Sequence, residues 1–322
     1  MHLVQSMAYV GEQPWHGLGH RLIPNQPLEV WAQQAGMDWR IETADVRFIA
    51  DRSLSYPGLL RAYPGQKVLY RSDTKAPLSV VSKRFKVVQP AEILEFYRDL
   101  TEIGGYELET AGVLKEGRKL WALARTNQSI TLKGRDTVNG YLLLATACDG
   151  TLATTAQFTS LRVVCNNTLS VAVAQGAGAV KVPHRSEFDA QAVKQQLGIA
   201  IAPWSSFSDY IKELANCRVT EKAVDSFLTK VFAYSAADTE PGPPMVNEHA
   251  MKKVQTLYAG QGKGAELSSA KGTAWGLLNS VTEYIDHHRR AHSNDHRRDA
   301  AWFGQGALLK QRAWSEALQL IA

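Results

Sequence analysis

A change of periodicity partway along the chain constrains the fold most. Between Trp39 and Phe158 the sequence consists of short alternating apolar and polar runs separated by turn residues. From residue 188 to the end, apolar residues recur at helical spacing instead. The pattern predicts an α+β fold, in which an antiparallel strand meander with packed helices is followed by a mainly helical C-terminal region.

The expected strands fall into two groups. The first lies between Trp39 and Val88 and comprises IETADVRFIA, KVLYRS, LSVVS and FKVVQ. The second is a meander from residue 105 to residue 158, which begins with the runs YELETAGVL and KLWALART. A loop of Lys115, Glu116 and Gly117 joins these two runs and has glycine where a hairpin needs a positive φ. The next pair, TVNGYLLLATA and TLATTAQF, is joined through the turn dipeptide Asp149–Gly150.

Capping residues and helical spacing mark the expected helices. They are Pro27 to Gly36, Pro90 to Leu100, a helix capped by Thr159 and closed at Gly176 and Gly178, and the ranges 188–216, 220–233, 247–258, 272–290 and 305–321. The stretch 234–246 is rich in Pro, Gly and acidic residues, which is typical of a flexible linker. With 322 residues, two domains are expected: an α+β core domain with an N-terminal arm at 1–183 and a mainly helical region at 184–322.

Composition excludes several classes of protein. Apolar residues make up 45% and charged residues 21%, the balance of a globular chain. No stretch reaches the roughly 18 apolar residues of a membrane span, and the first residues lack a signal core, so a cytoplasmic location is expected. Three widely spaced cysteines, Cys148, Cys165 and Cys217, give neither a disulfide framework nor a CxxC metal pair.

Basic residues cluster although the net charge is only +5. Such clusters favour a polyanionic partner, and neighbouring aromatic residues such as Phe85 and Trp121 favour single-stranded nucleic acid, whose bases stack on rings. Solvated faces of an ordinary surface carry the same residue types. The residues predicted to bind nucleic acid are Lys83, Arg84, Lys86, Arg118, Lys119, Trp121, Lys133, Arg135, Arg162, Asn166, Asn167, Arg289 and Arg290.

Polar side chains interrupt the apolar segment TSLRVVCNNTL, Thr159 to Leu169. Because buried unpaired amides cost about 1–3 kcal/mol each, Asn166 and Asn167 are expected to bond backbone, base edges or a neighbouring subunit. Arg162 is expected to hold a phosphate, or alternatively to fix the orientation of the helix. Cys165 has no histidine near it in sequence, so a buried structural thiol is favoured over a nucleophile.

A histidine row follows the segment GTAWGLLNSVTEYIDHH, Gly272 to His288. His288, His292 and His296 are spaced by four, so a continuous helix would align them with Glu283 and Asp286 as metal ligands. Ser293 and Asn294 are expected to break that helix, and the neighbouring arginines would repel a cation. No cofactor or metal is therefore expected, and the weaker metal candidates are Asp286, His288 and His292. Read without a metal, the stretch DHHRRAHSNDHRR is a basic, loop-like segment that would suit single-stranded nucleic acid.

Other catalytic motifs are absent from the sequence. The segment GQGKGAE resembles a phosphate loop, but it lacks the GxxxxGK[ST] spacing and follows no strand. The sequence also contains no GxSxG, HExxH or paired CxxC motif.

Five segments together resemble a family. They are PWHGLG at 14–19, VVSKRFKVVQPAEILEF at 80–96, CDGTLA at 148–153, LRVVCNNTL at 161–169 and GTAWGLLNSVTEYIDHH at 272–288. On these motifs the chain closely resembles, over nearly its whole length, phage/plasmid-like proteins of a domain-of-unknown-function family carried by prophages, phages and plasmids. The resemblance implies a role in mobile elements, and the meander followed by a helix is similar to the RecT, Erf and Red-beta single-strand annealing proteins.

Three functions are compatible with these observations. The first is a non-enzymatic protein that binds and anneals single-stranded DNA as a homo-oligomer, a ring or filament, without a cofactor or membrane. The second is a metal-dependent nuclease that uses Glu283, Asp286, His287, His288 and His292. The third is an inhibitor of host defence.

Overall fold

The computed structural model describes residues 4–11, 19–51, 57–102, 104–162, 164, 167–170, 179–198, 202–234 and 245–322. The chain forms two compact units that interleave along the sequence. Unit 1 is Met1–Arg125, Leu142–Gln157 and Ala179–Leu197, and unit 2 is Thr126–Tyr141, Phe158–Gly178 and Gly198–Ala322. The expected boundary between residues 183 and 184 concerns independently folding domains and stays a prediction.

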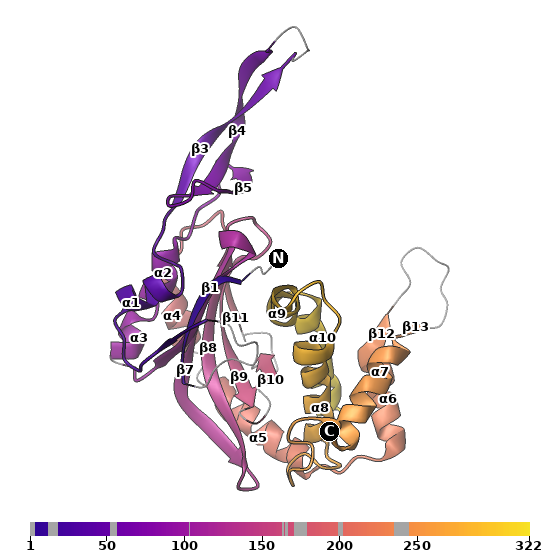
Figure 1. Ribbon diagram of the computed structural model, residues 1–322. Helices are drawn as coiled ribbons and strands as arrows, with labels where there is room; N and C mark the ends of the chain where they lie inside the picture. Colours follow the sequence, from indigo (N-terminus) through magenta and orange to yellow (C-terminus); the bar gives the residue numbers. More distant parts are fainter. Residues whose placement is uncertain are drawn as a thin grey trace. The chain divides into compact units, whose positions relative to one another are not determined.

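Strands lie mainly in the first part of the chain and helices in the last part (Figure 1), which confirms the predicted α+β class. The strands are β1 Val4–Val10, β2 His20–Leu22, β3 Ile41–Ala50, β4 Leu59–Arg71, β5 Pro77–Ser82, β6 Glu107–Leu114, β7 Lys119–Leu132, β8 Asp136–Ala147, β9 Thr154–Arg162, β10 Asn167–Ser170, β11 Ala179–Val182, β12 Ala233–Tyr234 and β13 Met245–Val246. The α-helices are α1 Leu28–Gln34, α2 Pro90–Glu95, α3 Arg98–Glu102, α4 Ala190–Gly198, α5 Ala202–Asn216, α6 Glu221–Phe232, α7 Glu248–Thr256, α8 Ala274–Glu283, α9 Asn294–Phe303 and α10 Gln305–Leu318. A 3-10 turn, η1, spans Lys115–Gly117, and two π-helical segments, η3 and η4, span Leu257–Gln261 and Tyr284–His288.

Unit 1 is built on an antiparallel sheet. Its strands follow the order β9-β8-β7-β6-β1-β2; β11 pairs with β9, and only β1 and β2 run parallel. The predicted hairpin joins β6 and β7 with Leu114 opposite Lys119. Its turn has positive φ at Lys115, Glu116 and Gly117, as the short loop requires.

Helix α2 provides the main polar anchor in the core of unit 1. It begins at Pro90 with a capping box between Gln89 and Glu92. Directly after it, the buried Tyr97 hydroxyl lies 2.8 Å from the Ala122 carbonyl oxygen and 3.0 Å from that of Leu142. A hydroxyl has one proton, so the two strands share it as acceptors.

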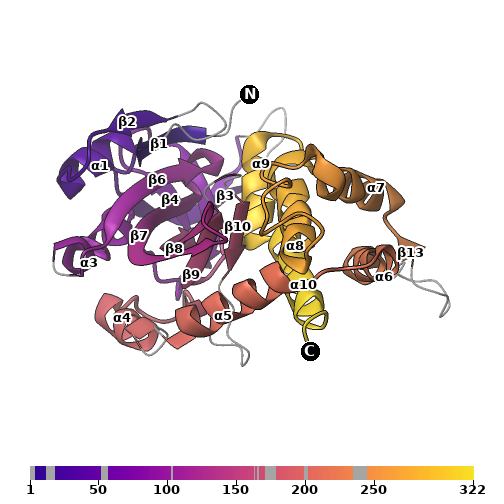
Figure 2. The ribbon, with the colours of Figure 1, turned by 90° about the horizontal axis from the view of Figure 1, so that it is seen from below.

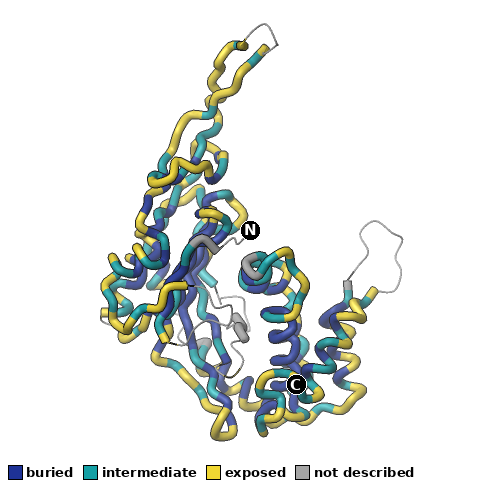
Figure 3. The backbone as a smooth tube through the Cα atoms, in the orientation of Figure 1, coloured by how far each residue is buried: buried dark blue, intermediate teal, exposed yellow. Residues whose placement is uncertain are grey.

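Strands β3, β4 and β5 form a separate three-stranded sheet within unit 1. At its base, Leu69 is fully buried, and the Gln89 side chain bonds both backbone groups of Ile41, at 2.8 and 3.1 Å. Beyond Gly65 only β3 and β4 pair with each other, and this ribbon is exposed along its length (Figure 3).

Unit 2 combines the remaining ends of β7, β8 and β9 with β10 and the C-terminal helices. Helix α8 is buried along its whole length and lies beside α5, α10 and β10 (Figure 2). Four helices of unit 2 are capped by side chains, because those of Thr220, Asn247, Thr273 and Ser293 accept backbone N–H bonds. The first three lie at or next to the predicted helix starts, 220, 247 and 272. Among the described residues, no helix is long and apolar enough to cross a membrane.

Three local predictions were wrong. The expected helix from Thr159 is instead β9 and β10, which pair antiparallel with Asn167 opposite Arg162, because β-branched residues in this run favour an extended ladder. The run FKVVQ is not a strand. The Phe85 N–H donates to the Ser82 carbonyl in a turn, and the Lys86 N–H donates to the His184 carbonyl. The loop-like segment after His292 contains α9, since the Ser293 hydroxyl caps a helix there.

Candidate nucleic-acid interface

One turn of unit 1 brings basic segments that are distant in sequence to the same place. The Cys148 N–H donates to the Arg118 carbonyl at 2.8 Å, and the Cys148 carbonyl accepts the Ser79 hydroxyl at 2.7 Å. Four residues later, the Leu152 carbonyl lies 2.9 Å from Nε2 of His184. The turn Cys148–Leu152 therefore joins Arg118, the end of β5 and the segment after β11.

The cations around this turn form what we call the basic cluster. Its members are Lys67, Lys83, Arg84, Lys86, Arg118 and Arg185. All are exposed except Lys67, which is half-buried and donates to the Phe85 carbonyl at 2.8 Å. The exposed Glu187 pairs with Lys86 and offsets one charge. The net positive surface suits a phosphate backbone.

A stacked ring pair lies within the basic cluster. The rings of Phe85 and His184 are 4.3 Å apart at an angle of 19°. Both ring nitrogens of His184 face carbonyl oxygens, Nδ1 towards Lys86 at 3.2 Å and Nε2 towards Leu152 at 2.9 Å. These two contacts fix the orientation of the His184 ring beside Phe85.

Part of this cluster was predicted from the sequence. Lys83, Arg84, Lys86 and Arg118 were expected to bind nucleic acid, whereas Lys67, His184 and Arg185 were not. The basic run KVPHRSEF, 181–188, was a signal for the last two, yet its pairing with Lys86 follows from the fold alone.

Burial removes three predicted residues from any surface. Lys119, Trp121 and Arg162 are 3%, 2% and 2% exposed. Every residue of β7 from Lys119 to Ala124 is buried, so both faces of this part of the strand are covered. Trp121 therefore cannot stack on a base here, and Arg162 does not reach a phosphate.

The remaining predicted residues belong to unit 2. Lys133 and Arg135 are exposed in the turn between β7 and β8, where Lys133 donates to the Ala215 carbonyl at 2.7 Å. Arg289 is half-buried and Arg290 is exposed after η4. Asn166 and the side chain of Asn167 lie outside the described part of the chain.

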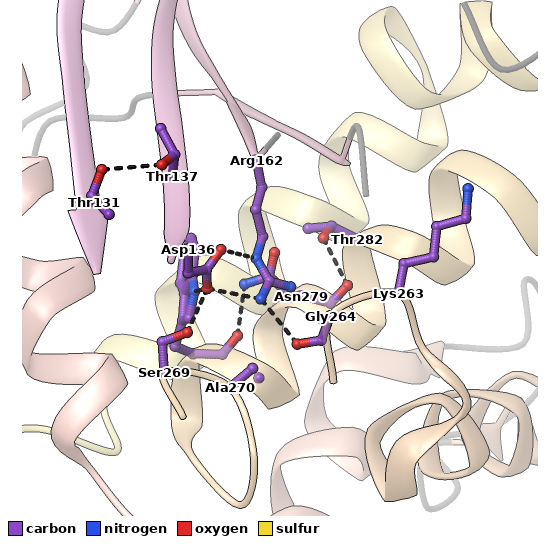
Figure 4. A network of polar contacts seen from close by, with 12 residues as sticks. Thr131, Asp136, Thr137, Arg162, Lys263, Gly264, Ser269, Ala270, Asn279 and Thr282 are labelled. Atoms are coloured by element: carbon purple, nitrogen blue, oxygen red, sulfur yellow. Dashed lines mark hydrogen bonds and ion pairs between the residues drawn. The ribbon is translucent and has the colours of Figure 1, made fainter. Parts of the chain in front are cut away.

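Arg162 instead completes a buried network in unit 2 (Figure 4). Its guanidinium binds the carboxylate of Asp136 through two bonds of 2.7 and 2.8 Å. The same carboxylate accepts the Ser269 hydroxyl at 2.6 Å and the Trp275 indole N–H at 3.0 Å. Asp136 is 1% exposed, so these four donors take the place of the hydrogen bonds that its carboxylate would make with water. The network ties β8 and β9 to the loop before α8.

Two further buried carboxylates are Glu283, the last residue of α8, and Asp286 in η4. Both oxygens of Glu283 accept the backbone N–H of Lys263, at 3.2 and 3.0 Å, and a Cβ on Gly262 would lie 3.0 Å from this carboxylate. Asp286 accepts the buried Lys310 ammonium at 2.8 Å. Protein donors thus already occupy the oxygens expected to bind a metal.

The histidine row is broken, as expected. The segment η4 ends at His288, and a new helix starts only after Ser293. Within the described residues, no three His, Cys, Asp or Glu side chains are grouped as a metal site requires. Nε2 of His288 lies 3.6 Å from Glu283, and the ring centroids of His292 and His296 are 5.8 Å apart.

Cys148 is a poor nucleophile. Burial raises the pKa of its thiol to about 12, so it stays protonated at neutral pH. Cys165 lies outside the described residues.

Comparison with known proteins identifies the class. A family model described as a domain of unknown function, DUF932, matches residues 77–302. The chain belongs to this family. No curated protein is significantly similar to it. The matched region includes most of the basic cluster and the whole network around Asp136 but not β3.

Proposed function

We propose that this protein binds single-stranded DNA through the basic cluster and anneals complementary strands as a homo-oligomer, in the cytoplasm of a host that carries a phage or plasmid. The assembly of Lys83–Lys86, Arg118 and Arg185 around one turn is the observation that supports this proposal most. Annealing needs no bond-making step, only two extended strands held with their bases accessible. The likeness to RecT, Erf and Red-beta proteins and the mobile-element origin come from the family resemblance.

The shape of the cluster favours a single strand. The stacked rings of Phe85 and His184 lie next to Lys86 and Arg185 in the sequence, and single-strand binders combine such rings with a basic track. The proposal predicts few base-specific contacts, because the exposed donors are long cations that reach phosphates.

Fluorescence anisotropy with a labelled oligonucleotide over a salt series tests the proposal. For single strands, log K falls as log salt rises, and each phosphate contact contributes about −0.7 to this slope. The double variant Lys83→Ala, Arg84→Ala should therefore make the slope less negative by about 1.4. The matched control is Lys222→Ala, Lys252→Ala, which removes two exposed charges from α6 and α7.

Equal slopes for both double variants would contradict the proposal, as would a lack of binding by the wild type at low salt. Annealing is measured separately, by the quenching of two complementary labelled strands. Intact strands after incubation with manganese distinguish annealing from the nuclease alternative, for which the described residues show no grouped ligands.

A further inference from the structure

The outer part of the β3–β4 ribbon exposes large apolar side chains. Phe48, Ile49, Leu59, Leu60 and Tyr63 are each between 44% and 61% exposed. They lie beyond Gly65, where β5 no longer pairs with β4. An isolated two-stranded ribbon is marginally stable in water, and a contiguous apolar patch typically marks an interaction site.

Both faces of the ribbon are apolar. Opposed residues of an antiparallel pair point to the same face, so Ile49 and Leu60 share one face. Phe48 lies on the other face, opposite Arg61, and Leu59 flanks it opposite Ala50. A ribbon that covers a core has one polar face, and here neither face is polar. Both faces are therefore suited to contact with protein.

We propose that this ribbon binds the ribbon of a second copy of the same chain in a head-to-tail manner. The Ile49–Leu60 face of one copy packs on the Phe48–Leu59 face of the next. A symmetric dimer would bury the same face of both copies and leave the other apolar face in water. A head-to-tail contact covers both, and it continues into a ring or a filament. The inference rests on the oligomeric part of the proposed function but not on DNA binding.

The composition of the ribbon favours protein over nucleic acid as its partner. Each face has one arginine: Arg47 flanks Ile49 and lies opposite Ala62, and Arg61 lies opposite Phe48. Aliphatic residues such as Ile49 and Leu60 provide neither phosphate contacts nor base stacking. Beyond Gly65, the outer edge of β4 is also free of β5, so a neighbouring strand can pair with it.

The exposed area predicts weak association. A fully enclosed aromatic side chain buries about 150–250 Å², so half-exposed Phe48 and Tyr63 offer roughly 100 Å² each. With the three aliphatic side chains the ribbon offers roughly 350 Å², well below the total of about 1,000 Å² of a stable interface. The associated fraction should therefore increase with protein concentration, and any further contact between the copies would strengthen the association.

Sedimentation velocity over a wide range of loading concentrations tests the inference with two face variants. The first is Ile49→Thr, Leu60→Thr, and the second is Phe48→Thr, Leu59→Thr; threonine retains the strand propensity. Each variant alone should lose the concentration-dependent species of the wild type. A mixture of the two should regain a dimer, because one intact face of each kind remains. Circular dichroism should show unchanged folding, since the replaced side chains are exposed.

Four results would overturn the inference. They are a monomeric wild type at every concentration, association that both variants retain, a mixture that fails to regain a dimer, and a loss of DNA affinity in both variants without a loss of association. DNA binding is measured separately, by the salt series with the Lys83→Ala, Arg84→Ala variant. The two proposals can therefore fail independently.

Discussion

Replacement of Asp136 should destabilise the protein more than replacement of an exposed carboxylate. Asp136 and Arg162 are 1% and 2% exposed, and Arg162 also donates to the Gly264 carbonyl at 3.2 Å. Breaking a buried ion pair costs about 3–5 kcal/mol, because one charge stays buried without its counter-ion. Ser269 and Trp275 would each lose an acceptor, at about 1–3 kcal/mol per group, and these losses overlap. We expect Asp136→Leu to lower the free energy of unfolding by about 4–6 kcal/mol.

A double-mutant cycle in urea isolates the ion pair. Asp136→Leu, Arg162→Met and the double variant should give a coupling energy of at least about 3 kcal/mol, since the double variant leaves no buried charge. The control is Asp209→Ala, which removes an exposed partner of Lys212 and should cost about 0–1 kcal/mol. If Asp136→Leu cost no more than Asp209→Ala, or the coupling were near zero, the network would not stabilise unit 2 as we describe.

Two further predictions concern buried groups of unit 1. Tyr97→Phe should lower the free energy of unfolding by about 1–3 kcal/mol, because the Ala122 and Leu142 carbonyls lose a buried donor; a midpoint in urea equal to that of the wild type would contradict this. Alkylation of Cys148 should be slow at pH 8 in the folded protein and should accelerate as the pH approaches its pKa of about 12, whereas denatured protein should react at pH 8; site-resolved mass spectrometry measures both rates.

The fold was predictable from sequence where local signals agree with tertiary pairing. The hairpin at Lys115–Gly117 was found because turn chemistry is local. The helices predicted at 220–233, 247–258 and 272–290 begin within two residues of their expected starts, where Thr220, Asn247 and Thr273 cap them. The segment from Thr159 to Leu169 was misread because its apolar residues fit a helical stripe as well as a strand. Pairing of Asn167 with Arg162 decided between them, and pairing of this kind is not encoded in periodicity.

The candidate site could be predicted only in part, for a related reason. Clusters of cations such as Lys83–Lys86 are visible in the sequence, but their connection to Arg185 depends on the bonds that Lys86 and Leu152 make with His184. The sequence also did not show which of the predicted residues are buried. Lys119 and Trp121 lie in a stretch of β7, 119–124, that is buried on both faces, and such burial comes from tertiary packing that the local sequence pattern does not encode.

The buried charges of unit 2 argue that its polar residues serve the fold, whereas those of unit 1 are available to a partner. Protein donors bind the carboxylates of Asp136, Glu283 and Asp286. Arg162 pairs with Asp136, and Lys310 pairs with Asp286. A binding protein needs charges whose partner is not already supplied. Lys86 of the basic cluster is paired with the exposed carboxylate of Glu187, and such pairs contribute little and exchange readily with phosphate. Two of the segments that identify the family, 80–96 and 148–153, contain Lys83, Arg84 and Lys86 and the turn Cys148–Leu152. Variants that test DNA binding should therefore be chosen from these segments and not from 161–169 or 272–288, whose charges serve the fold of unit 2.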